Sequence, residues 1–176
     1  MQPNHLHQTS RQSAALDPAG ICEAFGQALH NELAVEDVIT IAGQWSASNP
    51  LLAIAFYSVW LSRNSSPMSG VAWFNLGVLS RDMGDSRQAE TAFRAALAQM
   101  PLLSQARCEL AGVLERKGDL DEALDHCKVI LGPPGTIMQV ANSDDEAARQ
   151  RYVITLDLCG RLLEAKGRLG AAENIF

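Results

Sequence analysis

Hydrophobic residues in the middle of the chain recur with the spacing of an α-helix. In WFNLGVLSRDMGD, which begins at Trp73, apolar side chains stand mostly three or four positions apart rather than at every second position. Gly84 closes this segment with a residue suited to a helix end. Thirty-four residues further on, RCELAGVLERKGD begins at Arg107 and places the same kinds of residue in the same order, with Gly118 near its end. The equal spacing predicts that both segments are first helices of units in a repeated array.

The unit numbered from Gly70 contains two helices joined by a tight turn. Its first helix carries a W-x2-L-G motif that ends at Gly77, its second helix carries an A-x3-F motif that begins at Ala89, and Pro101 follows. The small residues of the two motifs let the paired helices approach closely, Gly84 permits the turn, and the proline ends the second helix. This order resembles the tetratricopeptide repeat, which implies an all-α fold: a right-handed superhelical array of antiparallel helix pairs.

Further segments fit the same register. This first clear unit covers residues 70–103, and the next, 104–137, follows without a gap; its matching residues are Leu110, Ala111, Gly118, Ala123 and Cys127. The unit 36–69 is degenerate, and its two small positions and final proline are Gly43, Ala55 and Pro67. A last unit over 153–176 is incomplete; its matching residues are Gly160, Gly167, Ala172 and Phe176. We therefore predict four units in sequence.

The predicted organisation has three parts. Residues 1–20 are a flexible tail, 21–35 form a leading helix, and 36–176 form the solenoid. A loop insertion over about 132–142 contains Gly-Pro-Pro-Gly, which is typical of a turn, and it displaces the register of the last unit. The segment 143–146, Ser-Asp-Asp-Glu, then matches a capping box, which predicts a longer first helix for that unit.

The chain stops at Phe176, partway through the second helix of the last unit. Repeat arrays bury the apolar face of each unit on its neighbour and end in a polar capping helix. Two alternatives follow: the sequence is part of a larger protein, or the terminal apolar surface packs on a partner or a second copy. We accordingly expect the isolated chain to self-associate through its C-terminal end, to fray near Leu169–Phe176, or to do both.

A narrower resemblance lies in WFNLGVLSRDMGD, then ELAGVLERKGDLDEAL, then an inserted loop and LCGRLLEAKGRLGAAE. This combination is similar to the repeat region of bacterial SPINDLY-type, O-linked N-acetylglucosamine transferase-like proteins. The resemblance implies repeats that present protein substrates to a following glycosyltransferase domain. In that family, asparagines just before the L-G pair hold the peptide backbone. Asn75 occupies this position here, whereas the other units carry Ile41, Glu109 and Leu158.

Composition restricts the class of partner. The chain has 176 residues, of which 47% are hydrophobic and 19% charged, and its net charge is −6. These values are ordinary for a globular domain, and the negative balance speaks against a nucleic-acid partner. The longest apolar run, PLLAIAFYSVWL, has 12 residues, too few to cross a membrane. The first residues lack the pattern of a secretory leader, so a cytoplasmic location is expected.

Residues for catalysis or metal binding do not form a recognisable set. The four cysteines, Cys22, Cys108, Cys127 and Cys159, contain no C-x-x-C pair and are expected to be buried hydrophobes. Histidines at His5 and His7 have no further ligands nearby, and the His126-Cys127 neighbours point in different directions from a helix. We predict no cofactor, no metal site and no enzymatic activity for these residues alone.

The leading hypothesis is a protein-protein interaction module. In such arrays the first helices of successive units line a concave surface, where residues not needed for packing can contact a peptide or protein segment. The residues predicted to do so here are Phe74, Asn75, Val78, Arg81, Asp82, Gln105, Glu109, Glu115, Arg116, Asp157 and Arg161. Two alternatives remain open: the N-terminal region of a protein O-glycosyltransferase, and a self-assembling scaffold.

Overall fold

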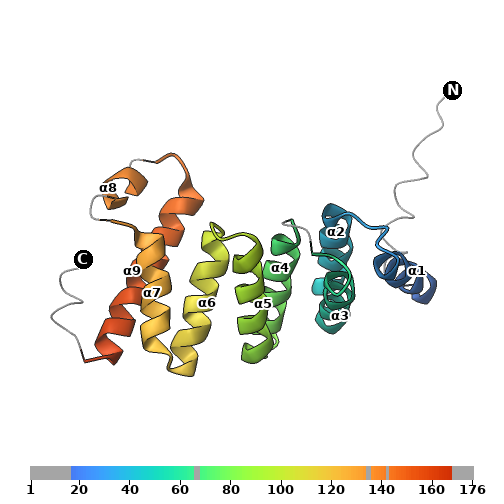
Figure 1. Ribbon diagram of the computed structural model, residues 1–176, viewed down its shortest axis with the longest axis horizontal. Helices are drawn as coiled ribbons and strands as arrows, with labels where there is room; N and C mark the ends of the chain where they lie inside the picture. Colours follow the sequence, from blue (N-terminus) through green and yellow to red (C-terminus); the bar gives the residue numbers. More distant parts are fainter. Residues whose placement is uncertain (1–16, 66–67, 134–135, 142, 168–176) are drawn as a thin grey trace.

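The computed structural model describes residues 17–65, 68–133, 136–141 and 143–167, which contain nine α-helices and no strand. The helices follow one another in a row from α1 at one end to α9 at the other (Figure 1). Their bounds are α1 Pro18–Leu29, α2 Val35–Ser46, α3 Pro50–Leu61, α4 Ser69–Asp82, α5 Ser86–Gln99, α6 Ser104–Lys117, α7 Leu120–Leu131, α8 Thr136–Ala141 and α9 Glu146–Ala165. The predicted all-α solenoid is therefore confirmed.

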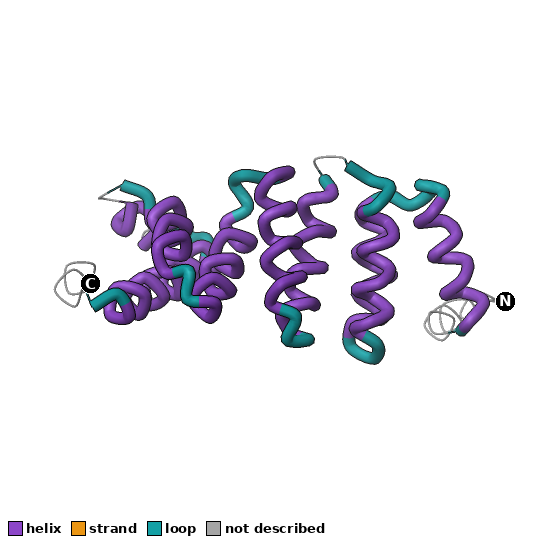
Figure 2. Tube along the Cα trace, turned by 60° about the horizontal axis from the view of Figure 1, so that its bottom comes forward, coloured by secondary structure: helices purple, strands orange, loops and turns teal. Residues whose placement is uncertain are grey.

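Neighbouring helices pack as pairs, and the pairs stack along the row. α2 packs on α3, α4 on α5 and α6 on α7, while α3 against α4, α5 against α6 and α7 against α9 join successive pairs. α9 thus follows the third pair in the place of another first helix, with the short helix α8 against it. Figure 2 shows the helices of the central pairs standing side by side with short connections between them.

Local signals explain where the central helices end. Gly84 and Gly118 both lie in the left-handed region, with φ of +83° and +90°, where a side chain would be strained. After the first of these turns, the side chain of Asp85 accepts a hydrogen bond of 2.9 Å from the backbone N–H of Gln88 at the start of α5. These signals act within a few residues, and sequence reading could therefore find them.

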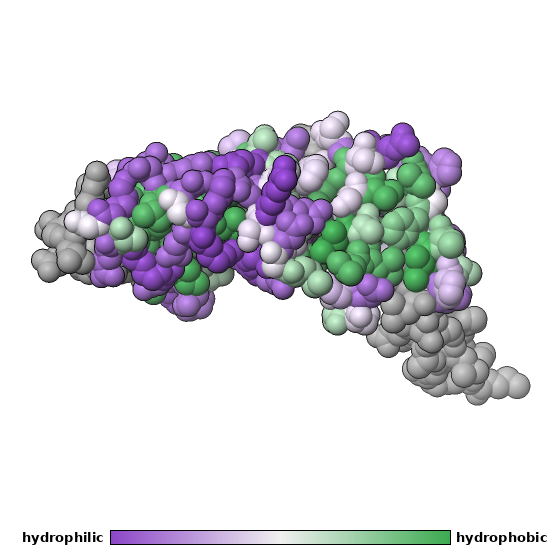
Figure 3. All heavy atoms as spheres, turned by 90° about the horizontal axis from the view of Figure 1, so that it is seen from below, coloured by the Kyte–Doolittle hydropathy of each residue, from purple (hydrophilic) through white to green (hydrophobic). Residues whose placement is uncertain are grey.

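The core consists of two clusters of buried side chains that meet at α4. Towards the N-terminus, Phe25 stacks on Trp45 at a centroid distance of 6.2 Å, and the Phe56 ring meets Trp45 edge-on at 5.0 Å. Towards the C-terminus, Phe93 and Leu110 lie at the centre of the second cluster, and Trp73 packs against both clusters. Figure 3 shows one face of the molecule, with hydrophobic residues gathered over the N-terminal helices and mostly hydrophilic residues over the remaining helices.

The degenerate unit differs from its predicted register. A Cβ added at Gly77 would lie 2.5 Å from Cε1 of Phe93, which is the close approach expected of this position. In contrast, Gly43 is exposed and an added Cβ would meet nothing within 4 Å, and Ala55 is exposed as well. Ala53, two positions earlier, is the buried small residue of α3. The assignment of Ala55 was wrong, because α2 has 12 residues where α4 has 14 and α3 therefore begins two residues early. Gly43 is the ninth residue of α2, as Gly77 is of α4, but its assignment to a close contact was wrong as well.

Other boundaries also differ. The leading helix runs over Pro18–Leu29 rather than 21–35, and the insertion predicted as a loop contains α8. The cap of α9 is Asp145, whose side chain accepts a bond of 2.9 Å from the N–H of Ala148; Ser143 instead accepts from the N–H of Asp145. α9 itself has 20 residues, so it is the longest described helix. The tail was predicted over 1–20, but residues 18–20 already belong to α1. Residues 1–16, together with Pro67, Ala172 and Phe176, lie outside the described residues.

Candidate interaction surface

The first helix of each unit borders the first helix of the next. α2 lies against α4, α4 against α6 and α6 against α9, so these four helices form one continuous face, called the first-helix face below. The residues predicted to bind a partner come from three of these helices: Phe74, Asn75, Val78, Arg81 and Asp82 on α4, Gln105, Glu109, Glu115 and Arg116 on α6, and Asp157 and Arg161 on α9.

Ion pairs join α4 to α6 on this face. Nη1 of Arg81 donates to Oε2 of Glu109, and its Nε and Nη2 donate to Oδ1 of Asp82 at 3.0 and 2.7 Å. The hydrogen bond to Glu109 is the main cause that raises the pKa of Arg81. The guanidinium therefore bridges two neighbouring units and is already partly satisfied within the chain.

A second set of ion pairs joins α6 to α9. Nε and Nη2 of Arg161 donate to the two carboxylate oxygens of Glu115 at 2.9 and 3.1 Å, a bidentate arrangement, and Nη1 donates to Asp157. The pKa of Arg161 is raised, first of all by the bond to Glu115. Among the predicted charged residues, Glu115 of α6 and Asp157 of α9 thus both pair with Arg161.

The N-terminal part of the first-helix face is hollowed and mostly apolar. The pocket on this part of the face has a volume of about 230 Å³. A larger pocket of about 550 Å³ lies between α5 and α6 and is described below. The smaller pocket lies between α2, α3 and α4, and its lining residues are Ile39, Ala42, Gly43, Ser46, Tyr57, Asn75, Val78 and Leu79. Only two of these residues were among the predicted partner-binding residues.

Asn75 sets the polar edge of this smaller pocket. Its Nδ2 donates to the hydroxyl of Tyr57 at 3.2 Å. Burial raises the pKa of Tyr57, and the bond from Asn75 partly opposes this rise. The α2 residues of the pocket were missed because the predicted partner-binding residues were taken from α4, α6 and α9 only.

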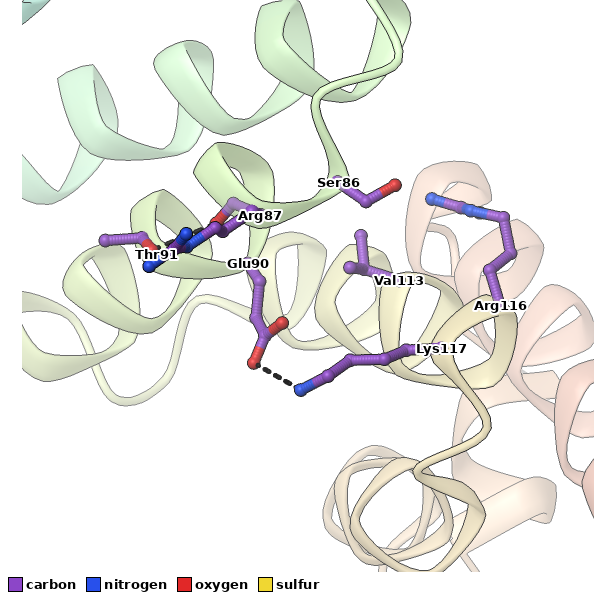
Figure 4. A pocket seen from close by; sticks show the side chains of 7 residues that line it. All are labelled: Ser86, Arg87, Glu90, Thr91, Val113, Arg116 and Lys117. Carbon is purple, nitrogen blue, oxygen red and sulfur yellow. Dashed lines mark hydrogen bonds and ion pairs between the residues drawn. The ribbon is translucent and has the colours of Figure 1, made fainter.

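The remaining predicted residues have different surroundings. Phe74 is half-buried, and its ring lies 6.0 Å from that of Phe93, so it also packs on the core. Gln105 is exposed on α6. Arg116 is exposed and lines the larger pocket between α5 and α6, together with Ser86, Arg87, Glu90, Thr91, Val113 and Lys117 (Figure 4).

Metal-ligating side chains and thiols are spread over the described helices. No group of three or more histidine, cysteine or acidic residues among them could hold a metal ion. Burial raises the pKa of Cys127 to about 12 and also raises the pKa values of Cys108 and Cys159, which favours the protonated thiols over the nucleophilic thiolates. None of the helices in the described ranges is long and apolar enough to span a bilayer.

Comparisons with known proteins agree with the helical repeats. Residues 74–135 match the family described as Tetratricopeptide repeat. One crystal structure of MamA superposes with a TM-score of 0.65 at 18% identity, covering 100% of this chain and 92% of MamA. A second MamA structure has a TM-score of 0.66 at 16% identity, covering 96% and 82%. None of the curated proteins compared with the chain matches it in sequence. At these identities the likeness to MamA concerns the fold.

Proposed function

Because the chain is an all-α solenoid with tetratricopeptide repeats, we propose that it is an interaction module that binds an extended segment of a partner protein on its first-helix face. The observation that carries the proposal is the pocket of about 230 Å³ between α2, α3 and α4. An open, mostly apolar hollow beside a half-buried amide suits one apolar anchor side chain of a peptide. Its volume is below the range of roughly 300–1,000 Å³ typical of small-molecule sites.

Asn75 supports binding of a peptide backbone at the edge of this pocket. A side-chain amide has two N–H donors and one acceptor, so Asn75 can bond to Tyr57 and to a peptide group at the same time. The bond to Tyr57 also holds the amide in place before a ligand arrives. Such preorganisation lowers the entropy cost of binding.

The paired charges further along the face serve a different purpose. Arg81 with Glu109, and Arg161 with Glu115, place both signs of charge beside the path of a bound segment. Charges at the rim of an interface change the rate of association and the choice of partner more than the affinity. We therefore assign affinity to the apolar pocket and selectivity to the ion pairs.

Gly43→Leu tests the proposal, because the new side chain starts in open space and fills the pocket. An added Cβ at Gly43 meets nothing within 4 Å, so the fold tolerates the change. Gly26→Leu on α1 is the matched control, since its Cβ also meets nothing within 4 Å and it does not line the pocket.

Peptides selected from a random display library against the full chain provide the probe, and fluorescence anisotropy measures their Kd. We expect Gly43→Leu to weaken binding by about tenfold or more, the loss that follows from excluding one anchor side chain, and Gly26→Leu to leave it unchanged. Selected peptides that bind Gly43→Leu as tightly as the unchanged chain would contradict the proposal.

The sequence likeness to SPINDLY-type proteins supports a second proposal, in which this solenoid presents substrates to a glycosyltransferase domain. The repeat-family match and the MamA structures bear only on the solenoid. Reading the gene past Phe176 tests the idea, since a nucleotide-sugar-binding domain should follow. We also propose that the protein acts in the cytoplasm and that its C-terminal end mediates self-association; sedimentation of the 176-residue chain tests the latter.

A further inference from the structure

The larger pocket, between α5 and α6, carries an excess of positive charge. Arg87 from α5, and Arg116 and Lys117 from α6, line a space of about 550 Å³ with a single carboxylate, that of Glu90. This balance is the reverse of the chain as a whole, whose net charge is −6. The local field therefore favours an anion where the rest of the molecule repels one.

The two arginines are not neutralised by the described part of the chain. Lys117 pairs with Glu90 at 3.4 Å and with Asp119 at 2.8 Å. Among the residues that the structure describes, no carboxylate lies within 4.0 Å of the guanidinium nitrogens of Arg87 or Arg116. Their donors remain available, in contrast to Arg81 and Arg161 on the first-helix face.

Two donor side chains of the pocket, those of Ser86 and Arg116, face each other, whereas Arg87 extends beside Thr91 and away from them (Figure 4). Figure 4 shows the hydroxyl of Ser86 and the guanidinium of Arg116 directed toward each other above the apolar side chain of Val113, with Glu90 held by Lys117 below. The Val113 side chain is buried and gives the pocket an apolar floor. A hydroxyl and a guanidinium on one side of such a floor are donors suited to a tetrahedral or planar oxyanion.

From this cavity and its unpaired arginines, we propose that the pocket binds an anionic side chain of a partner protein, a phosphoserine phosphate or an aspartate or glutamate carboxylate. Guanidinium groups bind both oxyanions with paired hydrogen bonds. This pocket is formed by α5 and α6, and it lies apart from the apolar pocket between α2, α3 and α4. The inference therefore goes beyond the proposed function and does not depend on it.

The test titrates the ¹⁵N-labelled full chain with three short peptides that differ at one central position: phosphoserine, aspartate or serine. We expect the anionic peptides to shift the amide signals of Ser86, Arg87, Val113, Arg116 and Lys117, and the serine peptide to leave them in place. A response to phosphoserine alone identifies a phosphorylated partner; a response to both identifies an acidic segment.

Variants connect the response to the two arginines. Arg87→Ala with Arg116→Ala should weaken binding by about tenfold or more, as expected for lost hydrogen bonds to a charged group. Arg63→Ala is the control, because Arg63 is exposed at the end of α3 and does not line the pocket. Gly43→Leu should leave the response unchanged, which separates this site from the apolar pocket.

Three results would overturn the inference. The first is the absence of local shifts with either anionic peptide. The second is an equal response of the double-arginine variant, checked by circular dichroism to be folded. The third is binding of a single-stranded oligonucleotide with the same arginine dependence while both anionic peptides fail, since this would assign the site to nucleic acid.

Discussion

Gly77→Ala should leave the protein less stable than Gly43→Ala does, although the repeat register places both glycines at the same position of a first helix. At Gly77 an added Cβ would lie 2.5 Å, 2.6 Å and 3.0 Å from three ring atoms of Phe93. At Gly43 an added Cβ would meet nothing within 4 Å. Each substitution adds one methyl group within a helix, so the pair differs chiefly in what surrounds that methyl group.

The expected change in the free energy of unfolding has two contributions, helix propensity and overpacking. Replacing glycine by alanine inside a helix stabilises it by about 1 kcal/mol, and this gain is common to both variants. Carbon atoms in contact normally lie about 3.5–4.0 Å apart, so the Phe93 ring must move when Gly77 is replaced. That ring is 0% exposed and rests against Phe74, so it has little free space. Overpacking of this kind costs about 1–3 kcal/mol.

The common gain cancels when the two variants are compared. Gly43→Ala should raise the free energy of unfolding by about 1 kcal/mol, and Gly77→Ala should fall below Gly43→Ala by about 1–3 kcal/mol. For a chain of 176 residues this difference corresponds to about 2–4 °C in Tm for each kcal/mol. Urea unfolding followed by far-UV circular dichroism measures it directly.

A third variant tests whether the Phe93 ring causes the lower stability of Gly77→Ala. Phe93→Leu removes the ring atoms that face Gly77, so Gly77→Ala in that background should lose most of its penalty. If Gly77→Ala proves as stable as Gly43→Ala in the unchanged background, the close packing of α4 on α5 described above is wrong.

Three further predictions concern individual side chains. Iodoacetamide at neutral pH should label the exposed Cys22 in the folded protein, and Cys127 only after denaturation, because burial raises the pKa of Cys127 to about 12; mass spectrometry of digests checks this. Equal labelling would contradict the assigned burial. Asn75→Ala should raise the pKa of Tyr57 further, since the Asn75 bond opposes the rise caused by burial; an ultraviolet titration with the other tyrosine replaced by phenylalanine should detect it. An unchanged or lower value would speak against that bond. Arg161→Ala should cost less than about 1 kcal/mol in urea unfolding, because its ion pairs are half exposed and solvent screens them. A larger loss would show that these pairs contribute to the packing of α6 on α9.

The helices of the central units could be predicted because their signals are local. The segment from Gly70 to Leu131 contains helical periodicity, turn glycines and a closing proline, each of which acts within a few residues of its position. The degenerate unit has no glycine in the turn between its two helices. Counting 34 residues back assumed helices of constant length, and the shorter α2 moves the buried alanine of α3 from position 55 to Ala53.

The candidate sites depend on contacts between helices, which periodicity does not specify. The pattern assigned Asn75 to the first-helix face, but its bond to Tyr57 depends on how α3 packs against α4. Likewise, Arg87 and Arg116 share a pocket only because α5 packs against α6. Sequence alone determined the all-α repeat architecture, since helix formation and turns are set by neighbouring residues. Tertiary structure decided which side chains meet and which remain open to a partner, since small differences in helix length and packing move these contacts between residues far apart in the chain.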